Sequence, residues 1–143
     1  MPKADRISAG GVKLLQEPQL AHFVTLMADG SPQTTPVWID VEPDGSAIYV
    51  NTAEGRVKTR NVANDNRVAV SVVDSANAWR YVLVRGTIVE RRREGADDQI
   101  DRLAFKYIGQ EKYPFRREGE QRVTLVIKPH HVLEMGTNEE NAH

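Results

Sequence analysis

Residues 47–61, AIYVNTAEGRVKTRN, connect a β-type segment to a basic segment. Three cations, Arg56, Lys58 and Arg60, lie within five residues of a chain whose net charge is only −1. If a helix begins near Gly55, its unpaired N–H groups and the positive end of its dipole lie beside these side chains. Such a strand-to-helix junction is suited to holding a phosphate, although an ordinary charged helix start fits the same pattern.

The segments on either side predict a series of β-hairpins. Asp29-Gly30 and Pro43-Asp44-Gly45 supply turn signals between β-type segments. Pro36 interrupts the hydrogen-bond ladder of its strand, which predicts an edge position or a bulge there. The expected strands cover residues 21–27, 32–41, 47–51, 67–73, 79–90, 122–127 and 132–135, and the expected helices cover 12–17, a short stretch ended by 64–66, and 94–108. This order predicts a mainly β (α+β) fold in which six or seven antiparallel strands, with a few short helices, can close into a barrel.

Length and composition set the broad class. The 143 residues predict a single domain over 1–143, with a core at about 10–136 and a frayed polar tail at 137–143. The net charge of −1 argues against nucleic-acid binding. The N-terminus lacks the apolar core of a signal peptide, and no apolar run approaches the roughly 18 residues that span a bilayer. We therefore expect a cytoplasmic protein that binds neither membranes nor nucleic acid.

The sequence contains no self-sufficient catalytic apparatus. The absence of cysteine excludes disulfides, thiolate catalysis and iron–sulfur clusters. No GxSxG, GxGxxG or GxxxxGK[ST] motif occurs, and no HxxxH or carboxylate cluster predicts a metal site. His22 lies alone in an apolar segment and is expected in the core, whereas His130 and His131 are adjacent and point to opposite faces of a strand. Redox chemistry would therefore require an organic cofactor, and no catalytic residue is assigned.

Helix geometry limits how the basic segment can bind an anion. On a regular helix Arg56 and Arg60 share a face, while Lys58 points about 200° away. All three converge on one phosphate only if the first of them precedes the helix; otherwise two bind the anion and the third makes a surface contact. Thr59 and Asn61 add hydrogen-bonding groups nearby.

Two aromatic segments are further candidates. Trp79 and Tyr81 are two residues apart and share one face of a strand. Such a pair can flank a planar ring, or it can fill the core or a subunit interface. Trp38, beside Pro36 and Val37, has the same two interpretations.

These segments together resemble a known superfamily. The resemblance covers about residues 10–136, and its most specific part is the Lys-Thr-Arg-Asn run with the strand before it. The segments that carry it are 29–38 (DGSPQTTPVW), 49–52 (YVNT), 56–61 (RVKTRN), 66–72 (NRVAVSV), 79–81 (WRY) and 84–87 (VRGT). They are similar to the pyridoxamine 5′-phosphate oxidase-like, FMN-binding split β-barrel superfamily, and more closely to its deazaflavin-dependent branch, which uses coenzyme F420.

The resemblance implies a homodimer whose cofactor sites lie at the subunit interface. It assigns the cofactor phosphate to Arg56, Lys58 and Thr59, with Asn61 supporting them. It places the deazaflavin ring along strands that contain Pro36, Val37, Trp38, Asn51 and Thr52. Trp79 and Tyr81 would come from the partner subunit, and Arg60 would serve the acidic oligoglutamate tail of coenzyme F420.

The implied activity is that of an oxidoreductase acting on a small molecule. Reduced deazaflavin delivers a hydride to an acceptor such as an enone, a quinone-like ring or a tetrapyrrole, and the protein orients the reactants. Two alternatives remain open: an FMN-binding oxidoreductase of the same superfamily, and a protein that holds a cofactor or haem without turnover.

Overall fold

The computed structural model describes residues 5–138. The helices are α1 (Ala9–Gln16), α2 (Val57–Asn64) and α3 (Ala96–Ile108). The strands are β1 (Ala21–Leu26), β2 (Pro32–Val37), β3 (Ile39–Val41), β4 (Ile48–Ala53), β5 (Arg67–Asp74), β6 (Asn77–Arg92) and β7 (Arg122–Met135).

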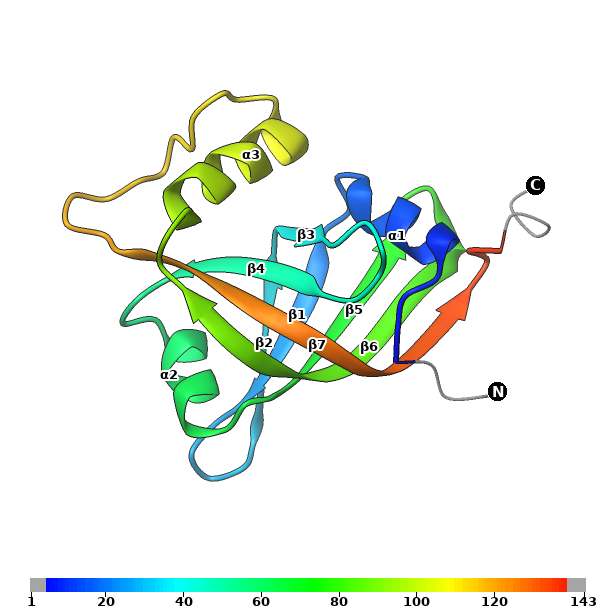
Figure 1. The fold of residues 1–143 in the computed structure, drawn as a ribbon, viewed down its shortest axis with the longest axis horizontal. Coiled ribbons are helices and arrows are strands. Elements are labelled where there is room, and N and C mark those ends of the chain that lie inside the picture. Colours follow the sequence, from blue (N-terminus) through cyan, green and yellow to red (C-terminus); the bar gives the residue numbers. More distant parts are fainter. Residues whose placement is uncertain (1–4, 139–143) are drawn as a thin grey trace.

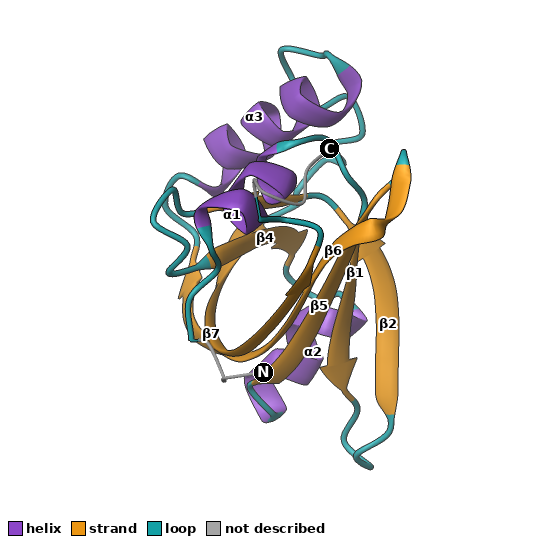
Figure 2. Cartoon of the chain, turned by 90° about the vertical axis from the view of Figure 1, so that its right-hand side faces the viewer, coloured by secondary structure: helices purple, strands orange, loops and turns teal. Residues whose placement is uncertain are grey.

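The seven strands form one antiparallel sheet in the order β2-β1-β5-β6-β7-β4-β3. The sheet curls into a half-barrel, with α1 and α3 above it and α2 below it in the orientation of Figure 2. At the left of Figure 1, β4 ends and β7 begins between α2 and α3. The predicted mainly β, antiparallel fold is thereby confirmed. Within residues 5–138, no helix is long and apolar enough to span a bilayer.

The predicted strand 32–41 is wrong in one respect, because the chain turns a corner at Trp38. Residues before the corner form β2, which pairs with β1, and residues after it form β3, which pairs with β4. β2 and β3 are therefore the two opposite edges of the sheet, joined by a single residue. The alternation of side chains continues through Trp38, so the pattern alone gives no sign of the corner. The edge position predicted for Pro36 is confirmed.

The two strand segments predicted at 122–127 and 132–135 form one continuous strand, β7. Its pairing with β6 shifts register between Arg85 and Gly86, which lie opposite His131 and Pro129. This bulge accommodates a proline that lacks an N–H group. It also brings the backbones close together: a Cβ on Gly86 would lie 2.2 Å from the carbonyl oxygen of Lys128.

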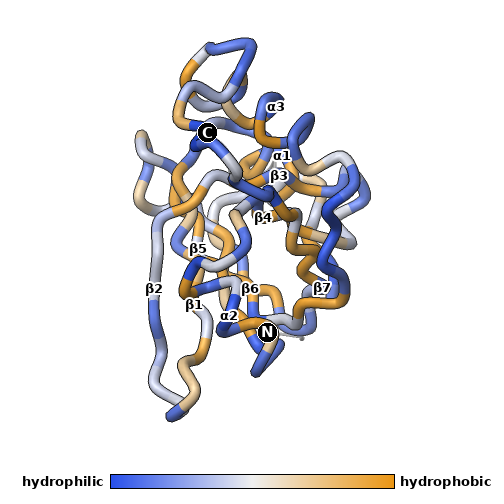
Figure 3. The backbone as a smooth tube through the Cα atoms, turned by 90° about the vertical axis from the view of Figure 1, so that its left-hand side faces the viewer, coloured by the Kyte–Doolittle hydropathy of each residue, from blue (hydrophilic) through white to orange (hydrophobic). Residues whose placement is uncertain are grey.

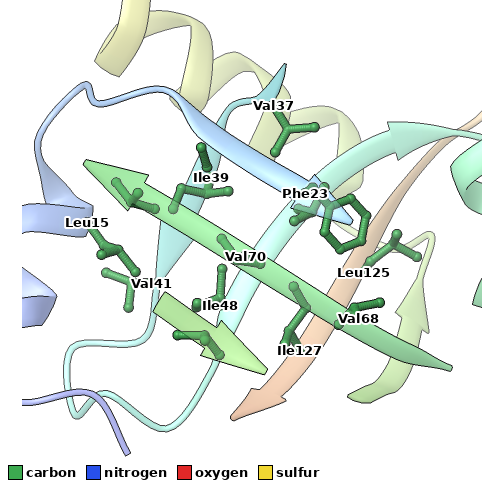
Figure 4. Packing of buried hydrophobic residues seen from close by; sticks show 14 of the residues in the cluster. Leu15, Phe23, Val37, Ile39, Val41, Ile48, Val68, Val70, Leu125 and Ile127 are labelled. Carbon is green, nitrogen blue, oxygen red and sulfur yellow. The ribbon is translucent and has the colours of Figure 1, made fainter. Parts of the chain in front are cut away.

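The core fills the inside of the half-barrel. Inward-facing residues of the strands pack there with Leu14 and Leu15 of α1, as Figure 4 shows for part of the cluster. The edge strand β2 is an exception, because only Val37 of its six residues is buried. In Figure 3 most of β2 is accordingly blue to white, the colours of hydrophilic and intermediate residues.

The predicted frayed tail at 137–143 begins too early, because its first residue is ordered by contacts. Thr137 is buried, and its hydroxyl donates a 2.6 Å hydrogen bond to Glu134. Residues 139–143 of the predicted frayed segment lie outside the described residues. At the other end, the hydroxyl of Ser8 accepts a hydrogen bond from the N–H of Gly11 and caps α1.

Candidate functional site

A cavity of about 290 Å³ opens where the β2–β3 corner, β4, the start of α2, α3 and the start of β7 meet. We call it the cationic cavity. It is lined by Leu20, Pro36, Val37, Trp38, Asn51, Arg56, Lys58, Ile100, Tyr113, Phe115 and Arg122. Six of the twelve residues that the sequence nominates for cofactor binding are therefore brought together here: Pro36, Val37, Trp38, Asn51, Arg56 and Lys58.

The start of α2 explains why Arg56 and Lys58 converge. Arg56 is the N-cap of α2 and has extended backbone angles, and Gly55 before it has a φ of 86°. Arg56 thus precedes the regular helix, which is the condition for Arg56 and Lys58 to share a site despite their spacing. Arg60 lies inside the helix, is exposed, and does not line the cavity.

Arg122 is a third cation in the cavity and is not among the residues nominated from the sequence. Its side chain is only 4% exposed. Its Nε donates a 2.9 Å hydrogen bond to Oδ1 of Asn51, and its Nη1 donates one of the same length to Glu120. An arginine that precedes an apolar strand is usually exposed to solvent, so the sequence gave little indication that Arg122 belongs to a binding site.

The side chain of Asn51, like that of Arg122, is fixed by several hydrogen bonds. Its Nδ2 donates to the carbonyl oxygen of Ala96 at 2.8 Å and to Oε1 of Gln99 at 3.0 Å. The hydroxyl of Thr124 also donates to Oε1 of Gln99, at 2.6 Å. A buried polar network from α3 to β7 therefore fixes the Asn51 side chain, which in turn orients Arg122.

The three cations act on one another electrostatically. Burial lowers the pKa of Lys58 below its usual value, and the positive charges of Arg56 and Arg122 lower it further. Within residues 5–138, the side chain of Lys58 forms no hydrogen bond or ion pair. An anion in the cavity would remove this repulsion, so the arrangement favours binding of a negatively charged group.

Aromatic rings form one wall of the cavity. Trp38 stacks on Tyr107 of α3 and meets Tyr113 edge-on, and Tyr113 in turn meets Phe115 edge-on. The connection that carries Tyr113 is fastened to α3, because its N–H donates a 2.8 Å hydrogen bond to Asp101. This wall can support a flat ring beside the cations.

Three nominated residues near α2 make internal hydrogen bonds or point elsewhere. Thr59 donates through its hydroxyl to the carbonyl oxygen of Ala53 at 2.8 Å, and Asn61 donates to the hydroxyl of Thr25 at 2.9 Å. Both side chains thus fasten α2 to the strands. Thr52 alternates with Asn51 along β4 and is buried on the other face, where its hydroxyl has no hydrogen-bond partner among residues 5–138. Direct cofactor contacts by these three residues stay predictions.

Trp79 and Tyr81 lie on β6, outside the cationic cavity of their own chain. Trp79 is 77% exposed, so it does not belong to the core of the single chain. A contribution of these residues to a partner's site stays a prediction.

The histidines also lie away from the cavity. His22 is exposed, contrary to the expectation that it belongs to the core, because β1 buries Ala21, Phe23 and Thr25 on its inner face. A 2.9 Å hydrogen bond joins Nε2 of His130 to the hydroxyl of Thr87. Over residues 5–138, no group of three or more histidine or acidic side chains is arranged to hold a metal ion.

A family model described as pyridoxamine 5′-phosphate oxidase matches residues 11–136. The chain belongs to this family. The pyridoxamine 5′-phosphate oxidase-like resemblance of the sequence is thereby confirmed, and the family binds flavin-type cofactors.

Solved structures support the same conclusion. An F420 reductase is 28% identical, covers 89% of this chain and 98% of its own, and has a TM-score of 0.78. A conserved hypothetical protein from Mycobacterium tuberculosis is 21% identical with a TM-score of 0.70, over 96% of this chain and 91% of its own. A putative pyridoxamine 5′-phosphate oxidase from Lactobacillus delbrueckii is 20% identical with a TM-score of 0.65, and covers 93% of this chain and 99% of its own. The last two likenesses concern the fold of the pyridoxamine 5′-phosphate oxidase family alone.

Proposed function

We propose that this member of the family is a coenzyme F420-dependent reductase. The observation that carries the proposal is the convergence of Arg56, Lys58 and Arg122 on one cavity beside the aromatic wall at Trp38. Such a site is suited to a ligand that joins an anionic group to a planar ring. The likeness to an F420 reductase, at 28% identity over 89% of this chain, supports the deazaflavin over other flavins.

Each part of the cavity has a separate task in this proposal. Lys58 and Arg56 bind the phosphate, and Arg122 adds a donor that Asn51 and Glu120 hold in place. Trp38, with Pro36 and Val37, forms the side of the cavity along which the ring lies. When bound, the reduced deazaflavin supplies a hydride for a small organic acceptor such as an enone, a quinone-like ring or a tetrapyrrole. The chain's own contribution is binding and orientation, which is consistent with the lack of a catalytic dyad or triad in the sequence.

The test is a comparison of cofactors. Purified protein is titrated with coenzyme F420 and separately with FMN, and binding is followed by cofactor fluorescence. We expect coenzyme F420 to bind more tightly, and its reduced form to be oxidised when members of an acceptor panel are added. Tight binding of FMN alone would overturn the assignment in favour of an FMN-dependent oxidoreductase. Binding of coenzyme F420 without turnover of any acceptor would favour a protein that only holds the cofactor.

We also propose that the protein is a homodimer. The outward face of β5, β6 and β7 exposes several large apolar side chains, including Val73, Leu83 and Leu133, and carries an apolar cavity of about 500 Å³. Monomeric proteins rarely leave such a patch uncovered. Sedimentation should give a dimer that Leu83→Asp dissociates. Phe105→Asp, an equally drastic change at an exposed position of α3, should leave it intact; a monomeric wild type would refute the proposal.

A further inference from the structure

Glu120 is a carboxylate in direct contact with the cations of the cationic cavity. It lies in the connection between α3 and β7, and its side chain is 9% exposed. Oε1 accepts a 2.9 Å hydrogen bond from Nη1 of Arg122, and Oε2 lies 3.5 Å from Nη2 of Arg56. One buried negative charge therefore faces two of the three cations from the protein side.

The two contacts of Glu120 differ in strength. Arg122 and Glu120 are both almost fully buried and form a short ion pair, whereas Arg56 is 44% exposed and its contact is long. An incoming anion can therefore take over Arg56 while the Arg122–Glu120 pair persists. Lys58 Nζ and Nη2 of Arg122 have no hydrogen-bond partner within residues 5–138 and stay free to bind the same anion.

Other acidic side chains near Glu120 do not contact these cations. Glu54 lines a neighbouring cavity with Glu120, and it is engaged by Arg91 at 3.0 Å and by Arg93 at 3.7 Å. Glu118 lines the same neighbouring cavity, is exposed, and makes no ion pair within the part of the chain that the structure describes. Glu120 is thus the carboxylate through which the chain reduces the positive charge of the cationic cavity.

We propose that Glu120 shifts the cavity's preference between the charge states of phosphate, toward a singly charged phosphodiester and away from a doubly charged phosphomonoester. The inference rests on the proposed function, in which this cavity holds the cofactor phosphate. Coulomb repulsion is proportional to charge, so Glu120 opposes a dianion about twice as strongly as a monoanion. The bias favours coenzyme F420, whose phosphate is a diester, over FMN, which ends in a monoester carrying a charge of about −1.5 to −2 at pH 7.

The test uses two small probes, phenyl phosphate and methyl phenyl phosphate, which differ in charge and carry no flavin ring. Their dissociation constants are measured at pH 8 by NMR titration of the wild type and of Glu120→Gln, which keeps the shape of the side chain and an acceptor for Arg122. If the substitution tightens diester binding about threefold, it should tighten monoester binding about tenfold, because the logarithm of the gain doubles with the charge.

Two further variants separate charge from structure. Glu118→Gln removes a charge two residues away that does not contact the cations, and should leave the ratio of the two affinities unchanged. Glu120→Asp moves the carboxylate but keeps its charge, and should keep the ratio close to that of the wild type. An unchanged ratio in Glu120→Gln, or a changed ratio in Glu120→Asp alone, would overturn the inference.

The outcomes also distinguish this inference from the proposed function. If both esters bind the wild type and Lys58→Ala weakens both, but Glu120→Gln tightens both equally, the phosphate site stands and the role of Glu120 is refuted. If neither ester binds the wild type or Glu120→Gln, the phosphate site itself is refuted, and the inference with it.

Discussion

The indole of Trp38 lies parallel to the phenol ring of Tyr107, with ring centroids 5.3 Å apart and planes within 5°. The hydroxyl of Tyr107 donates a 2.7 Å hydrogen bond to the carbonyl oxygen of Gln19 and accepts one of 3.2 Å from the N–H of Ile39. Tyr107 therefore fixes the corner at which the chain passes from one edge of the sheet to the other. Helix α3 thus fastens the corner that carries Trp38, which lines the cationic cavity.

Tyr107→Phe should destabilise the fold while leaving the stack in place. The substitution leaves the Ile39 N–H and the Gln19 carbonyl without this partner, which costs about 1–3 kcal/mol in the free energy of unfolding. Denaturant unfolding monitored by tryptophan fluorescence measures the change. Tyr81→Phe is the matched control, because the Tyr81 hydroxyl makes no hydrogen bond within residues 5–138. Equal stability of the two variants would contradict the role given to Tyr107.

Lys58→Ala should weaken binding of the phosphate-bearing cofactor by roughly 1.5–3 kcal/mol, the range for hydrogen bonds to charged groups. Lys13→Ala removes the same charge from an exposed position of α1 that does not line the cationic cavity. Its effect on affinity should stay below about 0.5 kcal/mol, as for surface changes in general. Fluorescence titration of both variants compares the two residues directly. Equal losses of affinity would show that Lys58 makes no specific contact with the phosphate.

Lys106 should make stability depend on pH in the alkaline range. Its ammonium group donates to the carbonyl oxygens of Leu15 and Ile39, and burial lowers its pKa to about 8. Between about pH 8 and 10.5 the folded chain has lost this proton while the unfolded chain keeps it, so the unfolded state binds more protons. The free energy of unfolding should therefore rise through this window, by roughly 3 kcal/mol in total, and Lys106 should cause no pH dependence below it.

Lys106→Met provides the reference for this measurement, since it lacks the titrating group. The difference in unfolding free energy between the wild type and Lys106→Met is followed from pH 7 to 10.5. A difference that stays constant over this range would show that the pKa of Lys106 is not lowered.

Thr52→Val should stabilise the protein. The hydroxyl of Thr52 is buried without a hydrogen-bond partner in the part of the chain that the structure describes, and a methyl group of similar size removes that cost. We expect a gain of about 1 kcal/mol in denaturant unfolding. Thr124→Val is the opposite case in the same part of the sheet, because the Thr124 hydroxyl donates to Gln99 at 2.6 Å, and this variant should lose stability. A loss in both variants would indicate that Thr52 has a partner in solution.

Much of the fold could be predicted from local patterns. Turn residues and alternating side chains placed the hairpins, and Pro36 was correctly expected at an edge because a proline cannot complete a ladder. The amphipathic spacing of α3 and the strand-to-helix junction before Arg56 were likewise visible, since both depend on residues close in sequence. The His22 prediction failed because Val24 and Leu26, apolar residues on the outward face, hide the alternation of β1.

The sequence by itself determined the antiparallel hairpin order and the basic strand-to-helix junction at residues 55–60, because turns, strand alternation and helix onset are set within a few residues. Only the tertiary structure decided that the chain turns at Trp38, that Arg122 and Glu120 join the cations, and that Thr52 faces away from them. Those features depend on which strands lie side by side and in which register, and the contact between Arg56 and Glu120 exists only after the sheet has curled.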